Sequence, residues 1–298
     1  MSDKIAGLTN DVIEQMANTP SPRLRQIMES AVRHLHAFAS EVQLTPEEWI
    51  TGIAFLTATG QMCNADRQEF ILLSDTLGLS SLVNLLHDQD GVSQATESSV
   101  LGPFFRENAP SLDHGESIAK PGNGGIAVSY YGRIIDTDGN PIPDANIQIW
   151  QTDADGWYDI QLHGQEVMDM RGSFTSDSEG WYRARSVLPK SYPLPHDGPV
   201  RRMLTAQDRH GYRPAHIHFL VSAEGHKELV TALYLEGDPY LHSDTVFGVT
   251  TPKLIVTPSL DEIDPLSGLS SIRYDFKLAT GTADAGRVGA DVSKINVE

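Results

Sequence analysis

The feature that most constrains how this chain can fold is a change in sequence texture at Gly102-Pro103. Before this point, apolar residues recur every three or four positions, as they do on one face of an α-helix. After it, glycine and proline become frequent, and apolar residues alternate with polar ones in short runs typical of β-strands. This change in the spacing of apolar residues predicts a helical N-terminal part followed by a β-rich part.

The helical period is clear in three places before that point. The segment Thr45-Pro46-Glu47-Glu48 predicts a helix start, with an N-cap hydroxyl, proline at the first helical position and acids in the first turn. A further helix is expected over residues 66–77, ending at Gly78 as a C-cap. The longest apolar stripe predicts an earlier helix and comprises Leu24, Ile27, Met28, Ala31, Leu35 and Phe38.

The second part of the chain contains several short runs with strand period, separated by turns such as Asp138-Gly139-Asn140-Pro141. Many short strands joined by turns favour a sandwich of two sheets. We therefore predict a mainly β chain, with an α-helical N-terminal region over residues 1–104 and an antiparallel β-sandwich domain over residues 105–298. The expected strands are Ile126–Ile135, Ala145–Gln151, Trp181–Val187, Ala215–Val221 and Leu229–Leu235.

Charge and cysteine content exclude several classes of function. The 298 residues carry a formal net charge of −18, which argues against binding to nucleic acid or to an anionic membrane surface. The single cysteine, Cys63, excludes an internal disulfide and a thiolate-based metal site, so any metal must be held by nitrogen and oxygen ligands. With no apolar leader or membrane-spanning run, we expect a cytoplasmic protein without membrane insertion.

The sharpest local motif is Tyr212-Arg213-Pro214-Ala215-His216-Ile217-His218-Phe219. Residues two apart on a strand point to the same face, so His216 and His218 project together while Ile217 points to the core. Two imidazoles on one rigid strand are suitable metal ligands. A His-x-His pattern alone is equally compatible with two half-exposed strand histidines.

Further ligands must be carboxylates or phenolates, and two tyrosines have distinctive contexts. Tyr158 ends the segment Asp153-Ala154-Asp155-Gly156-Trp157-Tyr158, and Tyr192 precedes Pro193-Leu194-Pro195, where proline stiffens the backbone. The chain has nine tyrosines, and spacing does not select these two. Taken alone, either tyrosine is better explained as an ordinary packing residue than as a ligand.

Four motifs in order resemble the intradiol ring-cleavage dioxygenases, the family that contains the catechol 1,2-dioxygenases. The resemblance extends over roughly residues 10–280 and implies a β-sandwich fold. The motifs are Trp150-Gln151-Thr152-Asp153-Ala154-Asp155-Gly156-Trp157-Tyr158, Arg171-Gly172, Tyr192-Pro193-Leu194-Pro195 with Gly198-Pro199, and the His-x-His segment.

The resemblance also implies a site. It makes Tyr158, Tyr192, His216 and His218 the ligands of one Fe(III) ion per subunit. It assigns catalytic roles to Arg213 and Tyr192, with Tyr192 displaced by the substrate and accepting a proton. It further implies a homodimer formed by the N-terminal helices, often with bound phospholipid, and an aromatic diol and O₂ as substrates.

The implied tyrosine ligands have a clear physical basis. A free phenol has a pKa of ~10, but a trivalent cation stabilises the phenolate so strongly that the ligand binds deprotonated. Phenolate is a hard oxygen donor that suits Fe(III), whereas two histidines with one carboxylate suit Fe(II). Arg213 would stabilise negative charge that develops on the substrate.

Within the family, the chain is most similar to the branch of the hydroxyquinol 1,2-dioxygenases. This likeness implies intradiol cleavage of hydroxyquinol (benzene-1,2,4-triol) to 3-hydroxy-cis,cis-muconate, the tautomer of maleylacetate. It rests on three segments: Glu97-Ser98-Ser99-Val100-Leu101-Gly102-Pro103-Phe104, Tyr192-Pro193-Leu194-Pro195 and Asp238-Pro239-Tyr240-Leu241. Ala232 occupies a strand position where catechol-cleaving relatives usually carry glutamine, and this departs from the catechol pattern.

The same likeness implies a set of residues around the substrate ring. Asp75 is the distinctive member, because a buried third hydroxyl needs a hydrogen-bond partner. The alternative is that Asp75 faces solvent on its helix and that the apolar members belong to the core. The full substrate-binding set is Leu72, Asp75, Val100, Leu101, Gly102, Pro103, Leu194, Pro195, Arg213 and Val246.

Two other functions remain open on the sequence. Residues 132–145 resemble a strand–turn–strand signature of transthyretin-like and adhesion-type binding modules, which are not catalytic and need none of the four ligands. The other alternative keeps the chemistry but changes the substrate to catechol or a chlorocatechol. Colour separates the first alternative, because a phenolate–ferric protein is red and a binding module is colourless.

Overall fold

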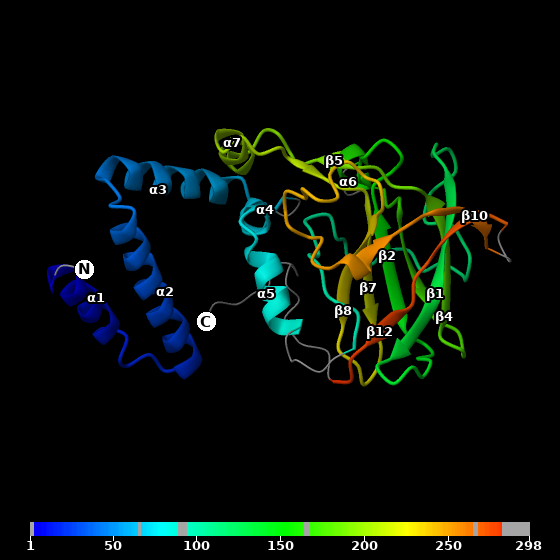
Figure 1. The fold of residues 1–298 in the computed structure, drawn as a ribbon, viewed down its shortest axis with the longest axis horizontal. Helices are drawn as coiled ribbons and strands as arrows, with labels where there is room; N and C mark the ends of the chain where they lie inside the picture. Colours follow the sequence, from blue (N-terminus) through cyan, green and yellow to red (C-terminus); the bar gives the residue numbers. More distant parts are fainter. Residues whose placement is uncertain (1–2, 65–66, 89–93, 164–166, 265–267, 282–298) are drawn as a thin grey trace. The chain divides into compact units, whose positions relative to one another are not determined.

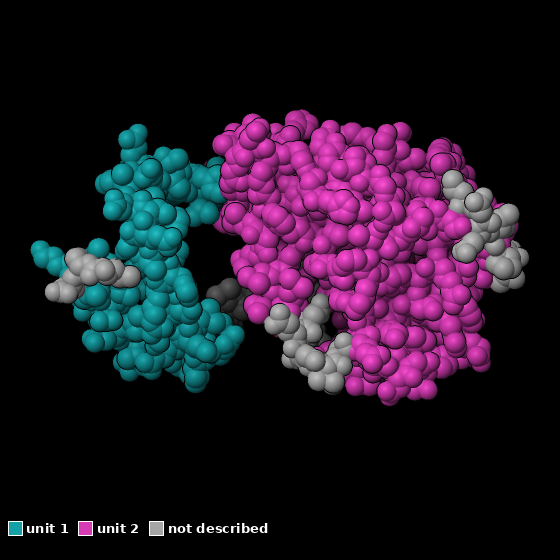
Figure 2. Space-filling view, viewed as in Figure 1, with its two compact units in different colours: residues 1–58 teal, residues 59–298 magenta. Residues whose placement is uncertain are grey.

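The computed structural model describes residues 3–64, 67–88, 94–163, 167–264 and 268–281. It divides into two compact units, Met1–Ala58 and Thr59–Glu298, which we call unit 1 and unit 2 (Figure 2). The division falls within a helix, α3. The sequence-based boundary near residue 104 remains a prediction about domain organisation.

Unit 1 contains the helices α1 (Asp3–Glu14), α2 (Pro22–Glu41) and the first part of α3 (Pro46–Gln61). The α2 and α3 starts follow from their capping residues. The Ser21 side chain accepts the N–H of Leu24. At α3, Thr45 Oγ1 accepts the N–H of Glu48 and the Glu48 carboxylate accepts the N–H of Thr45, which is a capping box. The predicted helix start at Thr45 is therefore confirmed.

Unit 2 begins with two short helices, α4 (Glu69–Thr76) and α5 (Leu79–Asp88). Gly78 separates them with φ +74°, a conformation that favours glycine, and this is the expected end of the helix. The predicted start at Asp66 lies outside the described residues. Two more helices, α6 (Asp159–His163) and α7 (Pro199–Ala206), were not predicted, because they lie within turn-rich sequence.

The strands of unit 2 form two five-stranded sheets and a two-stranded ribbon (Figure 1). One sheet has the order β10-β11-β1-β12, with β4 also paired to β1, and the other has the order β3-β2-β7-β8-β9. The ribbon pairs β5 with β6. The bounds are β1 Ala127–Asp136, β2 Asn146–Gln151, β3 Arg171–Thr175, β4 Trp181–Val187, β5 Tyr192–Pro193, β6 Tyr212–Arg213, β7 His216–Ser222, β8 Leu229–Leu235, β9 Ile255–Val256, β10 Ser259–Ile263, β11 Ser270–Arg273 and β12 Phe276–Leu278.

The five predicted strands correspond to β1, β2, β4, β7 and β8 within one residue at each end. The helical N-terminal part and the sandwich are thus confirmed. Pairing is antiparallel except where β1 meets β11 and β12 and where β8 meets β9. These parallel partners are short and come from the C-terminal part of the chain, so local period alone did not reveal them.

Strand β7 separates two buried clusters, and this arrangement positions the site. Ile217, Phe219 and Val221 belong to the core between the two sheets. The alternate residues of β7 point the other way, where Leu220 packs with Trp150 and with the rings of Tyr158 and Tyr192. The outward face of this sheet is therefore covered by the chain rather than by water.

Among the described residues, no single helix is long and apolar enough to cross a membrane. The pair α4 and α5 would pass such a test by length and composition together, although the two helices are bent by 73° at the break between them.

Candidate metal centre and active site

His216 and His218 point to the same side of β7, with their Nε2 atoms 3.0 Å apart. The Nδ1 atom of His216 lies 2.7 Å from the carbonyl oxygen of Pro214. Because a carbonyl can only accept, Nδ1 carries the proton and donates it, so Nε2 of His216 keeps its lone pair. This hydrogen bond to the backbone fixes the ring in the tautomer that a metal ligand requires.

The two candidate tyrosines approach these histidines from separate segments of the chain. The Tyr158 hydroxyl lies 3.4 Å from His216 Nε2. Tyr192 stands on β5, where it pairs with Arg213 of β6, and its ring centre lies 5.7 Å from that of His216 and 5.3 Å from that of Tyr158. Tyr158 and Tyr192 are 0% and 1% exposed, so both phenols lie in the interior with the imidazoles.

Burial determines the protonation states of the four candidate ligands. It lowers the pKa of both histidines well below the usual range, and the charge of Arg213 lowers both further. It raises the pKa of Tyr158 well above the usual range, with a further increase from Tyr192. Burial also raises the pKa of Tyr192, although Arg213 opposes that increase. Without a cation, the site therefore holds two neutral imidazoles and two neutral phenols.

This donor set has the spacing of ligands around one metal ion. Ligands that each lie about 2.1 Å from one ion at right angles are roughly 3 Å from each other, and the His216, His218 and Tyr158 donors are separated by 3.0 and 3.4 Å. Within the described ranges, no cluster of three or more His, Cys, Asp or Glu side chains could hold a metal. A site that includes phenols is thus the candidate that the structure offers.

Arg213 lies beside this centre and is 2% exposed. Its Nη1 donates to His216 Nε2 over 3.1 Å, and its Nε and Nη2 donate to the two oxygens of Asp244 over 3.2 and 3.1 Å. Nη2 also donates to the Tyr234 hydroxyl over 3.3 Å. Burial alone would lower the pKa of Arg213, but Asp244, Tyr192 and Tyr234 together raise it well above the usual range, so the guanidinium stays charged.

Asp75, on α4, is buried with 3% exposure, which excludes the solvent-facing alternative. Burial raises the pKa of this carboxyl to about 6, against the opposing influences of a hydrogen bond with Ser80 and the charge of Arg213. A buried acid within electrostatic range of Arg213 is available to pair with a polar group on a bound ligand.

Comparison with known proteins identifies the family. The sequence model of the family described as Dioxygenase matches residues 100–280, and that described as Catechol dioxygenase N terminus matches residues 21–94. The chain belongs to the intradiol ring-cleavage dioxygenases. It is an enzyme of this family, whose substrates are aromatic diols and O₂, and the non-catalytic binding module is thereby excluded.

Three relatives locate this dioxygenase within the family. It is 50% identical to 6-chlorohydroxyquinol 1,2-dioxygenase of Cupriavidus pinatubonensis, over 91% of this chain and 96% of the relative. The structure of hydroxyquinol 1,2-dioxygenase from Pseudomonas putida DLL-E4 matches with TM-score 0.85 and 41% identity, covering 94% of this chain and 100% of that one. The structure of catechol 1,2-dioxygenase from Acinetobacter sp. ADP1 matches with TM-score 0.81 and 28% identity, covering 96% of each chain.

The expected ring-binding residues of the dioxygenase lie at different depths. Gly102 contacts the site directly, because a Cβ added there would lie 3.5 Å from His218 Nε2. Leu101 packs in the cluster that contains Tyr158 and Tyr192. For the remaining expected residues the structure gives only their burial. Leu72, Val100, Leu194 and Val246 are buried, and Pro103 and Pro195 are half-buried.

The sequence analysis missed the partners of Arg213. Asp244 and Tyr234 lie 31 and 21 residues further along the chain. Asp244 also accepts the N–H groups of Val246 and Gly248, so one carboxylate fixes both the guanidinium and the loop after it. No local motif marks Asp244, and a contact map would have been needed to find it.

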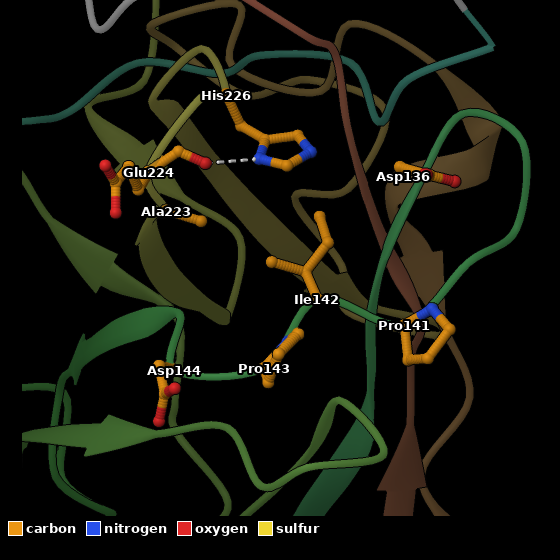
Figure 3. Close-up of a pocket in the computed structure, with 8 residues that line it drawn as sticks. All are labelled: Asp136, Pro141, Ile142, Pro143, Asp144, Ala223, Glu224 and His226. Atoms are coloured by element: carbon orange, nitrogen blue, oxygen red, sulfur yellow. Dashed lines mark hydrogen bonds between the residues drawn. The ribbon is translucent and has the colours of Figure 1, made fainter.

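A hollow of the dioxygenase, about 370 Å³ in volume, contains none of the site residues (Figure 3). It lies between the β1–β2 and β7–β8 turns, where His226 Nδ1 donates to the Glu224 carbonyl over 2.9 Å. Asp136 accepts the N–H groups of its own turn, at Asp138 and Asn140. These polar groups therefore form hydrogen bonds within their own turns. The lining residues are Asp136, Pro141, Ile142, Pro143, Asp144, Ala223, Glu224 and His226.

Proposed function

We propose that this dioxygenase cleaves hydroxyquinol between its two adjacent hydroxyl-bearing carbons, using one Fe(III) held by Tyr158, Tyr192, His216 and His218. The observation that carries this proposal is the convergence of imidazole and phenol donors at 3.0 and 3.4 Å in a fully buried site. The product would be 3-hydroxy-cis,cis-muconate, the tautomer of maleylacetate.

His216 and His218 would supply neutral nitrogen donors, which their lowered pKa values favour. Tyr158 and Tyr192 would give up their hydroxyl protons when a metal binds, because only a strong cation can overcome the burial that raises the pKa of both phenols. When bound, the ferric ion would supply the Lewis acidity that holds a deprotonated diol and prepares its ring for reaction with O₂.

Tyr192 would accept a proton, and Arg213 would stabilise negative charge. The phenol oxygen of Tyr192 is the group we expect to receive a proton from a substrate hydroxyl, because Arg213 is paired with it across the β5–β6 ribbon and favours its anionic form beforehand. The guanidinium of Arg213 would then stabilise negative charge on the substrate oxygens. Its fork is held on Asp244, which leaves Nη1 directed at the histidine side of the site.

The choice of hydroxyquinol rests on Asp75. Hydroxyquinol differs from catechol by a third hydroxyl, and a buried carboxyl close to Arg213 offers that hydroxyl a partner. When catechol binds, the same carboxyl has no such partner, at a cost of about 1–3 kcal/mol, or ~5- to 150-fold in specificity. The greater similarity to the hydroxyquinol enzyme of known structure supports this choice over catechol.

The test measures O₂ uptake with hydroxyquinol and with catechol for the wild type and for Asp75→Ala. We expect the wild type to prefer hydroxyquinol in kcat/KM, and the variant to lose most of that preference. The ratio of the two substrates within one preparation cancels differences in iron content and folding. A wild-type preference for catechol would overturn the substrate assignment, and an unchanged ratio in the variant would remove Asp75 from it.

A ring-chlorinated triol is a second candidate substrate, because the relative that is 50% identical is a 6-chlorohydroxyquinol 1,2-dioxygenase. The same assay with 6-chlorohydroxyquinol decides this question. A kcat/KM equal to or above that for hydroxyquinol would make the chlorinated triol a substrate of equal standing. A large loss would show that the pocket excludes the halogen.

We further propose that the dioxygenase is a homodimer, joined by its N-terminal helices and able to bind phospholipid there, in the cytoplasm. The support is the apolar stripe of α2, whose residues Leu24, Leu35 and Phe38 are 50, 65 and 55% exposed in the single chain. A contiguous apolar surface of this kind marks an interface. The test is molar mass by light scattering, with lipid extraction from the purified protein.

A further inference from the structure

We infer that a buried ion triad, Arg106–Asp159–Arg171, is the positioning device that holds Tyr158 at the metal. The inference rests on the proposed role of Tyr158 as a ligand and extends it to residues outside the centre. All three members are nearly inaccessible to solvent, with 7, 3 and 3% exposure for Arg106, Asp159 and Arg171. None of them contributes a donor atom to the proposed site.

The Asp159 carboxylate is saturated with donors. Arg171 engages both of its oxygens, with Nε at 2.7 Å from Oδ2 and Nη2 on Oδ1. Arg106 Nη1 donates to Oδ2 over 2.9 Å. The backbone N–H groups of Ile160 and Asp169 donate to the same carboxylate over 2.8 and 3.1 Å.

The triad fixes Tyr158 from two directions. Asp159 is the next residue along the chain, so its bonds immobilise the backbone from which the Tyr158 side chain extends. Arg171 Nη1 also donates to the carbonyl of Phe104 over 3.2 Å. The Phe104 ring stacks on the Tyr158 ring, with centres 4.4 Å apart and planes 23° from parallel. One guanidinium thus binds both the carboxylate of the residue next to Tyr158 and the backbone of Phe104, whose ring packs on the Tyr158 phenol.

The triad also connects with the histidine side of the centre. In the register of the sheet, Arg171 of β3 is opposite Trp150 of β2, and Trp150 is opposite His218 of β7. The Trp150 and His218 rings stack, with centres 4.7 Å apart and planes 3° from parallel. Arg171, Trp150 and His218 therefore occupy adjacent positions across three strands, and this row connects Arg171 with a proposed ligand.

Stability alone does not account for such a triad. The desolvation cost of a buried ion pair often exceeds its Coulomb attraction, and apolar replacements of similar volume are commonly as stable. What two arginines on one carboxylate do provide is a fixed geometry, because the planar guanidinium fork of Arg171 accepts few orientations. Fixed supports around metal ligands typically matter ~10- to 100-fold for metal affinity.

The experiment uses the iron-loaded enzyme and three variants. Asp159→Asn removes the charge at constant size, and Arg171→Lys keeps the charge but cannot span both oxygens and the Phe104 carbonyl. Asp264→Asn is the matched control, because Asp264 is also buried and pairs with Arg183 of β4 at 3.1 Å. It also accepts the hydroxyl of Ser129 of β1 over 2.9 Å, and β1 and β4 belong to the sheet that carries none of the proposed site residues. Each variant is measured for iron release to a chelator, for the visible phenolate band, and for thermal unfolding.

We expect Asp159→Asn and Arg171→Lys to release iron ~10- to 100-fold faster and to shift the visible band. Asp264→Asn should keep the wild-type release rate and band even where its unfolding temperature falls. Repeating Asp159→Asn in a Tyr192→Phe background assigns the shift, because Tyr158 is then the phenolate that remains. If the triad only stabilised the fold, its variants would not shift the band. A shift that is absent in the control therefore supports a positioning role.

The inference fails if both triad variants fold and keep the wild-type band and release rate. It also fails if Asp264→Asn changes both quantities to the same extent, because general destabilisation would then be the cause. A wild-type protein that binds no iron and shows no visible band would instead refute the proposed function. The two failures are therefore distinguishable in one set of measurements.

Discussion

Helix α2 in unit 1 and strand β7 in unit 2 have equally regular apolar patterns, yet their side chains meet opposite environments. On β7, Ile217 and Phe219 are 0 and 1% exposed. On α2, Leu35 and Phe38 are 65 and 55% exposed, and the helix buries none of its residues. A periodic pattern therefore shows which face of an element is apolar, but not whether residues of the same chain bury that face.

Polar residues show the reverse contrast. Unit 2 buries Arg213, Asp75 and Asp159 together with the two histidines of β7. Burying such groups is unfavourable unless each has a partner, so a cluster of them indicates chemistry inside the unit. In unit 1 the unusual feature is instead an exposed apolar stripe, and this stripe is the basis of the proposed dimer interface. Each feature can be tested separately.

The largest expected effect concerns the buried polar set. His216→Ala removes a donor from the centre, and we expect nearly complete loss of iron and of the visible band. Iron per chain, measured by elemental analysis, checks this outcome. His226→Ala is the control, since His226 lines the hollow between the β1–β2 and β7–β8 turns. This variant should keep the wild-type iron content. Full iron in His216→Ala would show that the ligand assignment is wrong.

The next effect concerns the exposed apolar set. The double variant Leu35→Glu, Phe38→Glu places two charges in the α2 stripe. Burial of each apolar side chain contributes about 1.5–3 kcal/mol, and a twofold interface counts each residue twice, so the dimer dissociation constant should rise at least ~10³-fold. Sedimentation over a concentration series measures it.

The matched control for the stripe is Gln26→Glu, which adds a charge to an exposed polar position of the same helix. It should leave the dissociation constant close to the wild-type value. A double variant that dimerises as tightly as the wild type would place the interface elsewhere and make the exposed stripe of α2 unrelated to assembly.

Arg213→Ala should have a smaller effect, confined to unit 2. We expect iron content and the visible band to stay near wild type while kcat falls ~10²-fold, because the guanidinium acts on charge that develops during the reaction. Steady-state kinetics normalised to iron content measure the change. If the whole loss of activity follows lost iron or lost folding, Arg213 is a structural partner of Asp244 instead.

The smallest effect is a pH dependence of stability from Asp75. Its pKa in the folded chain, about 6, lies above the ordinary 3.8, so the folded state binds the proton more tightly. The resulting stabilisation is fully present below pH 3.8 and is lost as the pH rises through 6. One pKa unit corresponds to about 1.4 kcal/mol, which limits the effect to about 3 kcal/mol.

Asp75→Asn tests this dependence, because the amide does not titrate. Its free energy of unfolding, relative to that of the wild type, should increase between pH 4.5 and pH 7.5, as measured by denaturant titration at both pH values. Comparison at each pH cancels the titration of other groups. A difference that is independent of pH would contradict the raised pKa of Asp75.

The sequence by itself determined the elements whose period is local. The strands β4 and β8 were predicted at their observed bounds, and the capped start of α3 followed from Thr45 and Glu48. The shared face of His216 and His218 also needed no tertiary information, because a strand repeats every two residues. Such features depend on residues a few positions apart, and the backbone geometry relates them directly.

Only the tertiary structure determines which side chains lie beside those histidines. Tyr158 is 58 residues from His216, and Asp244 is 31 residues from Arg213, so no local period relates either pair. The sequence could name Tyr158 and Tyr192 through family resemblance, but it gave no reason to prefer them among nine tyrosines. Asp159 and Asp244 had no signal at all, since a buried carboxylate and a surface one look alike in sequence. Their roles follow from sheet register and loop packing, which bring distant segments together only when the whole unit has folded.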